Sequence, residues 1–266
     1  MHVNSTVGLF PEGASLDEGQ VIAPSKSQRW LIGKWKQYWQ DVEHIAGKLK
    51  ADKITTVING DWGDKNRHSS FQLIEPENDS IILDWMRAVM YPARKLCEKR
   101  IFVVRGTEAH TGGSGWLENE AAKGINAQIN DKTGQPSFWV LRLNPEGVRI
   151  LFAHHPMTNG RVKWTNGSAA NRAAASVALD YYNEPERPDL AIFGHVHHSE
   201  DSYDNQPVRV VYSCPWCLVD NFTHRIGEGL AAIKVGGLIV AVEGDRFRVY
   251  KAYYDTPAED RQWIKI

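Results

Sequence analysis

The sequence contains few cysteines, no long apolar run and almost no net charge, and each of these absences excludes a class of protein. Three cysteines in 266 residues are too few for a disulfide framework. The 31 Lys and Arg residues balance 32 Asp and Glu residues, so the chain has no global positive field to collect nucleic acid. The longest apolar run, at 237–242, has only the length of a strand. Residues 1–5 lack the basic and apolar segments of a signal peptide. We therefore expect a soluble, cytoplasmic protein without a membrane partner.

Apolar periodicity divides the chain into an early half that alternates helix and strand and a late half rich in strands. We predict a loop at 1–24 and helices at 25–49, 116–129 and 167–182. A further helix should begin at about residue 80 and be interrupted at Pro92. We predict strands at 54–58, 101–104, 190–193, 208–212, 230–234, 238–242 and 247–254, and a hairpin that joins 138–143 to 148–153. This order predicts one domain over 1–266 of the α/β (α+β) class, with a two-sheet β sandwich flanked by helices.

Four short clusters of metal-binding side chains each follow a predicted strand. They are Gly60-Asp61-Trp62-Gly63-Asp64, Gly106-Thr107-Glu108-Ala109-His110, His154-His155 and Gly194-His195-Val196-His197-His198. Loops at the carboxyl ends of neighbouring strands converge on one edge of a sheet, where ligands bind. Carboxylate oxygen and imidazole nitrogen together suit divalent first-row metals better than calcium. The sequence therefore predicts a metal site at the C-terminal ends of the strands.

Each cluster by itself has a purely structural interpretation. A Gly-Asp pair is common in turns, and a lone pair of histidines is usually at the surface or satisfied in the core. The Gly-His-x-His cluster is more specific, because alternate residues of an extended segment place both imidazoles on the same side. All four clusters occur in one order, each after a strand, and this favours a shared metal centre over coincidence.

In this order the clusters resemble the motifs of the calcineurin-like metallophosphoesterase superfamily, across essentially the whole chain. The family pattern runs Asp-x-His, Gly-Asp-x-x-Asp, Gly-Asn-His, a single His and Gly-His-x-His. The stretch from His2 to Leu9 is similar to the end of the first motif. Together with Gly-Thr-Glu-Ala-His, it resembles a branch of the family found in phage and bacterial genomes.

The resemblance implies a metal-dependent hydrolase with two divalent cations, Mn²⁺, Fe²⁺ or Zn²⁺. Asp61 would bridge the two ions, with His2 and His197 on the first and His154 and His195 on the second. A metal-activated hydroxide would attack phosphorus in line with the leaving oxygen. The substrate would be a phosphoester, including a nucleotide or nucleic acid, which leaves phosphodiesterase, nuclease and phosphomonoesterase (phosphatase) activities open.

Two further residues receive roles from the same resemblance. Asp64 would orient a histidine rather than bind metal itself. His110 would act as the acid that protonates the leaving group.

The chain departs from the family pattern at two places. Only Met1 precedes His2, whereas the pattern has an aspartate two residues before the histidine, so we expect the first β-strand to be missing and the first metal site to be weakened. Thr107 stands where the pattern has the ligand asparagine, and Glu108 could supply the oxygen instead. His154 is preferred to His155 as a ligand because of the family pattern, while side-chain direction stays open.

Two other features have competing interpretations. The Cys214-Pro-Trp-Cys217 segment looks like a redox pair, but the following residues lack a helical pattern and a single CxxC is too little for structural zinc, so we favour packing. The helix at 25–49 combines lysines with Trp30, Trp35 and Trp39. It could bind nucleic acid, but tryptophans on an amphipathic helix more often belong to the core.

Two functions compete with hydrolysis. A catalytically impaired binding or structural module on the same fold would explain the altered first and third motifs, and a CxxC oxidoreductase would use the cysteine pair. Retention of Asp61, His154, His195 and His197 favours the hydrolase. The oligomeric state and the natural substrate stay open.

Overall fold

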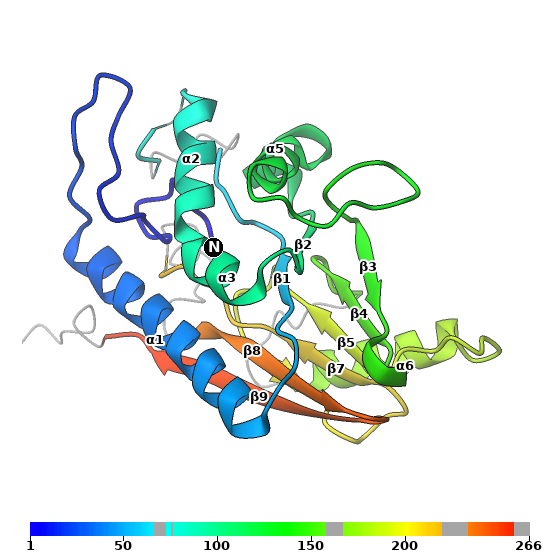
Figure 1. The fold of residues 1–266 in the computed structure, drawn as a ribbon. Coiled ribbons are helices and arrows are strands. Elements are labelled where there is room, and N and C mark those ends of the chain that lie inside the picture. The colour runs from blue at the N-terminus through cyan, green and yellow to red at the C-terminus, as the bar shows by residue number, and fades with distance from the viewer. Residues whose placement is uncertain (66–72, 76, 158–166, 220–233, 258–266) are drawn as a thin grey trace, which may run out of the picture.

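A computed structural model describes residues 1–65, 73–75, 77–157, 167–219 and 234–257 as a mixed α/β fold (Figure 1). A central mixed sheet has the strand order β3-β4-β5-β7-β6. Its strands are β3 (Val140–Leu143), β4 (Ile150–Ala153), β5 (Leu190–Phe193), β6 (Glu200–Asp201) and β7 (Arg209–Tyr212). The strands β4, β5 and β7 run parallel to one another, while β3 and β6 pair antiparallel at the two edges.

Most predicted strands of this sheet are confirmed. The hairpin is formed by β3 and β4, with a short 3-10 turn, η2 (Pro145–Gly147), between them. The strand at 190–193 coincides with β5, and the strand at 208–212 begins one residue late as β7. The two-residue strand β6 escaped prediction, because two residues are too few to display an alternating pattern.

Two further pairs of strands lie beside this sheet. β1 (Thr56–Asn59) pairs in parallel with β2 (Ile101–Val104), and β8 (Lys234–Glu243) pairs antiparallel with β9 (Arg246–Asp255). β1 lies slightly later than the predicted 54–58. The strand predicted at 230–234 falls almost wholly outside the described residues, and its last residue begins β8. The described strands are thus divided among three sheets, whereas we predict two.

Helix α1 (Lys26–Leu49) illustrates how local sequence sets an element's limits. The Ser25 side chain accepts a hydrogen bond from the Gln28 N–H, and the Gln28 side chain accepts one from the Ser25 N–H, which forms a capping box. Trp35 and Trp39 are each only 6 % exposed. The Trp35 indole also donates to the Val89 carbonyl at 2.9 Å. The packing interpretation of these tryptophans is therefore confirmed.

The remaining helices cover the sheets from several sides. They are α2 (Asp79–Val89), α3 (Tyr91–Cys97), α4 (Glu108–Thr111), α5 (Trp116–Gly124) and α6 (Ser168–Asp180), with the 3-10 turn η1 (Gly113–Gly115) before α5. The predicted interruption near Pro92 is confirmed, since Met90 separates α2 from α3. Helix α5 ends earlier than the predicted 129, because Gly124 weakens the helix and Asn126 adopts a φ of 54°. In the described ranges, no helix is both long and apolar enough to span a membrane.

The first half of the loop at 1–24 packs deeply although it contains no helix and only isolated bridges. Val3 forms a parallel bridge with Gly63, its N–H donates to the Trp62 carbonyl at 3.0 Å, and its carbonyl accepts from the Asp64 N–H at 2.8 Å. Val3, Leu9 and Phe10 are each at most 1 % exposed. These contacts fix the position of His2 next to the segment that follows β1.

Candidate metal centre

The predicted site residues follow the C-terminal ends of β1, β2, β4 and β5. Asp61 lies just after β1, Thr107 after β2, His154 after β4 and His195 after β5. Since β1 and β2 are parallel, as are β4 and β5, each pair delivers its loops to one edge. Segments far apart in the sequence therefore meet in one place.

A first group of side chains gathers around the hydroxyl of Thr107. The Asp61 Oδ2 atom lies 2.9 Å from His154 Nε2, and the Thr107 N–H donates to Asp61 Oδ1 at 2.7 Å. The Thr107 Oγ1 atom is 3.3 Å from His154 Nε2 and 3.2 Å from His195 Nδ1. Three predicted ligands thus lie around Thr107.

A second group contains His2, His197 and Cys217. The Nε2 atoms of His2 and His197 are 3.2 Å apart, and Cys217 Sγ lies 3.8 Å from His197 Nδ1. One ligand atom from each of the three lies within 4.8 Å of the others. Sequence reasoning assigned Cys217 to packing, and although it is buried, it also borders the site. A thiolate beside two imidazoles suits Zn²⁺.

Asp64 lies between two histidines. Its Oδ2 atom is 3.4 Å from His2 Nδ1, and its Oδ1 atom is 3.1 Å from His110 Nδ1. Asp64 is only 6 % exposed, so water competes little with these contacts. The placement suits the predicted orienting role, which itself stays a prediction.

Two sequence-predicted alternatives lie beside these groups, and one of them, His155, offers a ring nitrogen within 4.8 Å of ligand atoms of His154 and His195. The Glu108 side chain is exposed, and its carboxylate accepts a hydrogen bond from the Ser114 N–H at 3.1 Å. Glu108 belongs neither to the group around Thr107 nor to the group of His2, His197 and Cys217. His155 is exposed, and its ring centroid is 4.4 Å from that of His195. His154, by contrast, is 4 % exposed and contacts Asp61 directly. Whether Glu108 or His155 binds metal stays a prediction.

Two glycines permit this close approach of backbone and side chains. A Cβ atom on Gly60 would lie 2.1 Å from His154 Nδ1, and Gly60 has a φ of +81°. A Cβ atom on Gly106 would lie 2.2 Å from the Asp61 amide nitrogen. Any other residue at either position would push a predicted ligand away.

The pKa values of three histidines favour neutral imidazole. Burial, followed by the charges of neighbouring histidines, lowers the pKa of His195 to about 4. Burial lowers the pKa of His2 despite its contact with Asp64, and it lowers that of His197 well below its usual value. Near neutral pH these rings therefore keep a lone pair free for a cation.

The carboxylates of the site are held ionised. Burial by itself would raise the pKa of Asp61, but the charge and hydrogen bond of His154, with His2 and His110, hold it well below its usual value. Burial is likewise outweighed at Asp64, where the hydrogen bonds of His110 and His2 lower the pKa. Although burial opposes it, the charge and hydrogen bond of Asp61 raise the pKa of His154, so a bound cation would take the place of the proton on this ring. Ionised carboxylates together with imidazoles are a donor set that fits divalent first-row cations.

Glu118 of α5 is a site residue that sequence reasoning missed. It is fully buried, and its carboxylate accepts the Trp62 N–H at 3.0 Å and the Gly106 N–H at 2.6 Å. It therefore ties together the loops that follow β1 and β2. Burial, with the nearby charge of Asp61, raises the pKa of Glu118 to about 7. The sequence offers no signal for this role, because a glutamate on an amphipathic helix usually faces solvent.

The raised pKa of Glu118 predicts a specific pH dependence of stability. Between the usual carboxyl pKa of 4.5 and about 7, the folded state binds more protons than the unfolded state, so the free energy of unfolding falls as pH rises. In metal-free protein, Glu118→Gln should remove this contribution, about 3 kcal/mol over the window. Denaturant unfolding of both proteins at pH 4.5, 6 and 7.5 measures the difference. Parallel pH profiles for the two proteins would refute the assignment.

Comparisons with known proteins add little to this picture. No family model and no curated protein matches the chain. It is similar to the zinc complex of Vps29 from Entamoeba histolytica, at 12 % identity and a TM-score of 0.33, over 76 % of this chain and 98 % of that one. Vps29 from Cryptosporidium parvum gives 12 % identity and a TM-score of 0.30, over 75 % and 96 %.

A third solved structure is a conserved uncharacterised protein from Streptococcus pneumoniae, described as a predicted phosphoesterase. It gives 13 % identity and a TM-score of 0.27, over 80 % of this chain and 90 % of that one. Scores and identities this low support no conclusion about family, so the chemistry of the site rests on its own geometry.

Proposed function

We propose that this chain is a metal-dependent hydrolase of phosphoester bonds. The observation that carries the proposal is the meeting of Asp61, His154 and His195 around one hydroxyl, beside a second group that contains His2 and His197. Four segments that are distant in sequence bring a carboxylate and four imidazoles together. Four imidazoles close to one carboxylate are more than a single ion pair requires, which favours a ligand role over a structural one.

The residues present suit two divalent cations. Asp61 would lie between them, with His154 and His195 on one side and His2 and His197 on the other. Mn²⁺, Fe²⁺ and Zn²⁺ all accept nitrogen and oxygen donors of this kind. When bound, such ions supply the Lewis acidity that activates water near neutral pH and offsets charge on phosphoryl oxygens.

The protein's own groups would handle the leaving group. Oδ1 of Asp64 lies 3.1 Å from Nδ1 of His110. The other ring nitrogen of His110, Nε2, is then left for a substrate oxygen. Although burial opposes it, the hydrogen bond of Asp64 and the charge of Asp61 raise the pKa of His110. A protonated imidazole near neutral pH is a suitable general acid.

Hydrolysis of bis-p-nitrophenyl phosphate and p-nitrophenyl phosphate, with and without added Mn²⁺, tests the proposal. We expect turnover that requires metal and stops with excess chelator. The ratio of the two rates distinguishes diesterase from monoesterase activity. Metal binding measured by calorimetry, without turnover of either substrate, would instead favour a binding or structural module on the same fold.

Replacement of His110 should affect substrates according to their leaving groups. His110→Asn is expected to slow hydrolysis of an alkyl phosphoester by roughly 10²–10⁴-fold, because a poor leaving group needs a proton. Esters of p-nitrophenol should lose far less, since nitrophenolate leaves without protonation. The rates for both ester classes, measured at the same pH and metal concentration, check this. Equal losses would remove the acid role from His110.

A further inference from the structure

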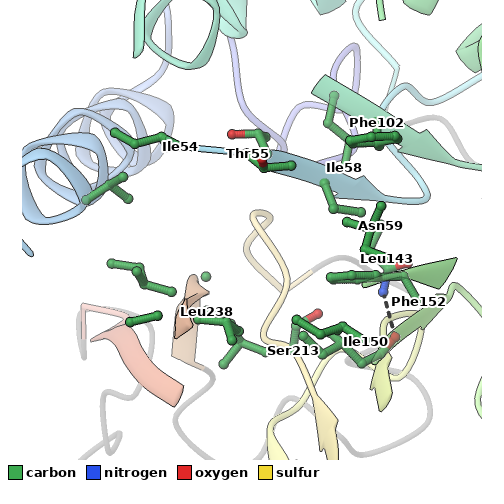
Figure 2. A pocket seen from close by; sticks show the side chains of 18 of the residues that line it. Ile54, Thr55, Ile58, Asn59, Phe102, Leu143, Ile150, Phe152, Ser213 and Leu238 are labelled. Carbon is green, nitrogen blue, oxygen red and sulfur yellow. Dashed lines mark hydrogen bonds between the residues drawn. The ribbon is translucent and has the colours of Figure 1, made fainter. Parts of the chain in front are cut away.

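A large cavity lies between β1 and β8, and apolar side chains from several elements line it (Figure 2). Its volume is about 1450 Å³, whereas one water molecule needs only roughly 10–15 Å³ of such space. Protein interiors are otherwise packed as densely as organic crystals, with few voids larger than a water molecule. The apolar part of this lining suits an extended apolar segment.

The cavity is walled on two opposite sides, like the space that holds a strand between two layers. One wall contains Ile150, Phe152 and Ile192 of the central sheet, and α1 contributes Trp39, Val42 and Ile45 to the lining. Figure 2 shows Ile58 above the space and Leu238 below it. A strand that lay in such a space would be covered by apolar side chains on both faces. The sequence of a strand of that kind is a continuous run of Val, Ile and Leu.

The edges that border the cavity are free of strand partners within the described residues. β1 pairs only with β2, and β8 pairs only with β9. At the start of the outer edge of β8, the Gly236 N–H donates to the Pro215 carbonyl at 3.2 Å and the Leu238 carbonyl accepts from the Tyr38 hydroxyl at 3.0 Å, so the edge is open to a strand beyond Leu238. The Thr56 N–H donates to the Arg100 carbonyl on the β2 side, so the backbone groups of Val57 point to the opposite edge. Val57, Leu238 and Val240 are only partly buried, although each packs against the core. An edge strand facing apolar space is a template for pairing.

The chain itself indicates the direction in which a strand would enter. Val3 already runs parallel to the continuation of β1, through its bridge to Gly63 and its hydrogen bonds to Trp62 and Asp64. Met1 lines the cavity, and backward extension of this path leads along the free edge of β1. The cavity is therefore continuous with an existing parallel pairing.

We propose that the cavity is a binding site for one extended apolar β-strand, which runs parallel to β1 and leads into Met1. Paired with both free edges, this strand would unite β2, β1, β8 and β9 in one sheet. That sheet would face the central sheet and produce the two-sheet sandwich predicted from the sequence. The cavity also borders the metal centre, since His2, Asp61 and His154 are among its lining residues. The inference itself concerns packing, and its test measures stability and amide exchange instead of turnover.

Two extensions added before Met1 of the full chain test the inference. The first has two lysines for solubility and then seven Val, Ile and Leu residues, which extend over about 23 Å as a strand. The matched control has the same length and charge, but replaces the apolar residues with Ser, Gly and alternate Pro, which cannot form the ladder. Both retain a peptide N–H at Met1 for its hydrogen bond to the Asp61 carbonyl.

We expect the apolar extension to raise the thermal midpoint by about 10 °C over the control, because several apolar side chains become buried. Amide exchange at 55–59 and 238–242 should slow at least tenfold. Equal midpoints and unchanged exchange would overturn the inference. So would association into dimers without protection of these amides, which would assign the free edges to a second copy.

If the extended chain fails to fold, the Lys-flanked apolar peptide is added in trans to the original chain. Slower exchange at the same two segments would then support the inference. Unchanged exchange at saturating peptide would overturn it.

Discussion

Replacement of Asp61 with asparagine is expected to lower metal-dependent hydrolysis at least a thousandfold while the chain stays folded. The amide has the shape of the carboxylate but not its charge, and the Thr107 N–H can still donate to its oxygen. Loss of the charged ligand between two cations removes several kcal/mol of stabilisation, and about 4 kcal/mol corresponds to a thousandfold in rate. Steady-state rates with Mn²⁺, calorimetric metal titration and circular dichroism measure the three consequences.

The matched control for this change is Asp131→Asn, which alters an exposed carboxylate on a turn after α5. It should leave the rate, the metal affinity and the thermal midpoint unchanged. A variant at Asp61 that retained a tenth of the activity with the same metal affinity would contradict the bridging role.

Gly106→Ala should disable the site without removing any titratable group. The new Cβ atom would lie 2.2 Å from the Asp61 nitrogen and 2.3 Å from its Oδ1 atom, so the loop after β1 must shift. Overpacking of this kind costs about 1–3 kcal/mol of stability. A displacement of about 1 Å at reacting groups can cost a hundredfold in rate. We expect both effects, measured by thermal unfolding and by hydrolysis at saturating metal.

Gly113→Ala provides the comparison within the same loop. Nothing lies within 4 Å of a Cβ atom at Gly113, so the substitution should be close to neutral. Similar losses for both variants would indicate that the loop tolerates no change at all, and would contradict the specific contact with Asp61.

Much of the fold follows from local sequence. The Ser25 and Gln28 pair marks the start of α1, and Pro92 marks the break before α3. Runs of β-branched and aromatic residues locate β2 and β5 to the residue, because strand propensity and burial coincide there. The end of α5 is less predictable, since the left-handed conformation of Asn126 competes with continued helix by a small margin.

The residues of the candidate site also fall into those that the sequence predicts and those that it does not. Asp61 and His195 are recognisable because short motifs after strands have a known spatial consequence. Glu118 is not, because it reaches the site from a helix with no motif of its own. Cys217 is not either, because its CxxC segment is typical of redox chemistry or packing and not of a site shared with His2 and His197. The direction of the Glu108 side chain depends on a hydrogen bond to Ser114, a contact that no spacing rule predicts.

Periodicity, capping and the chemistry of neighbouring residues predict most of the strands and helices and the clusters of ligands that follow the strands. The contacts of Thr107 with Asp61, His154 and His195, and the joining of two loops by Glu118, appear only once the chain is folded. Folding also leaves the edges of β1 and β8 facing an apolar cavity. The physical reason is that contacts between distant segments arise from packing in three dimensions, which no local pattern of residues encodes.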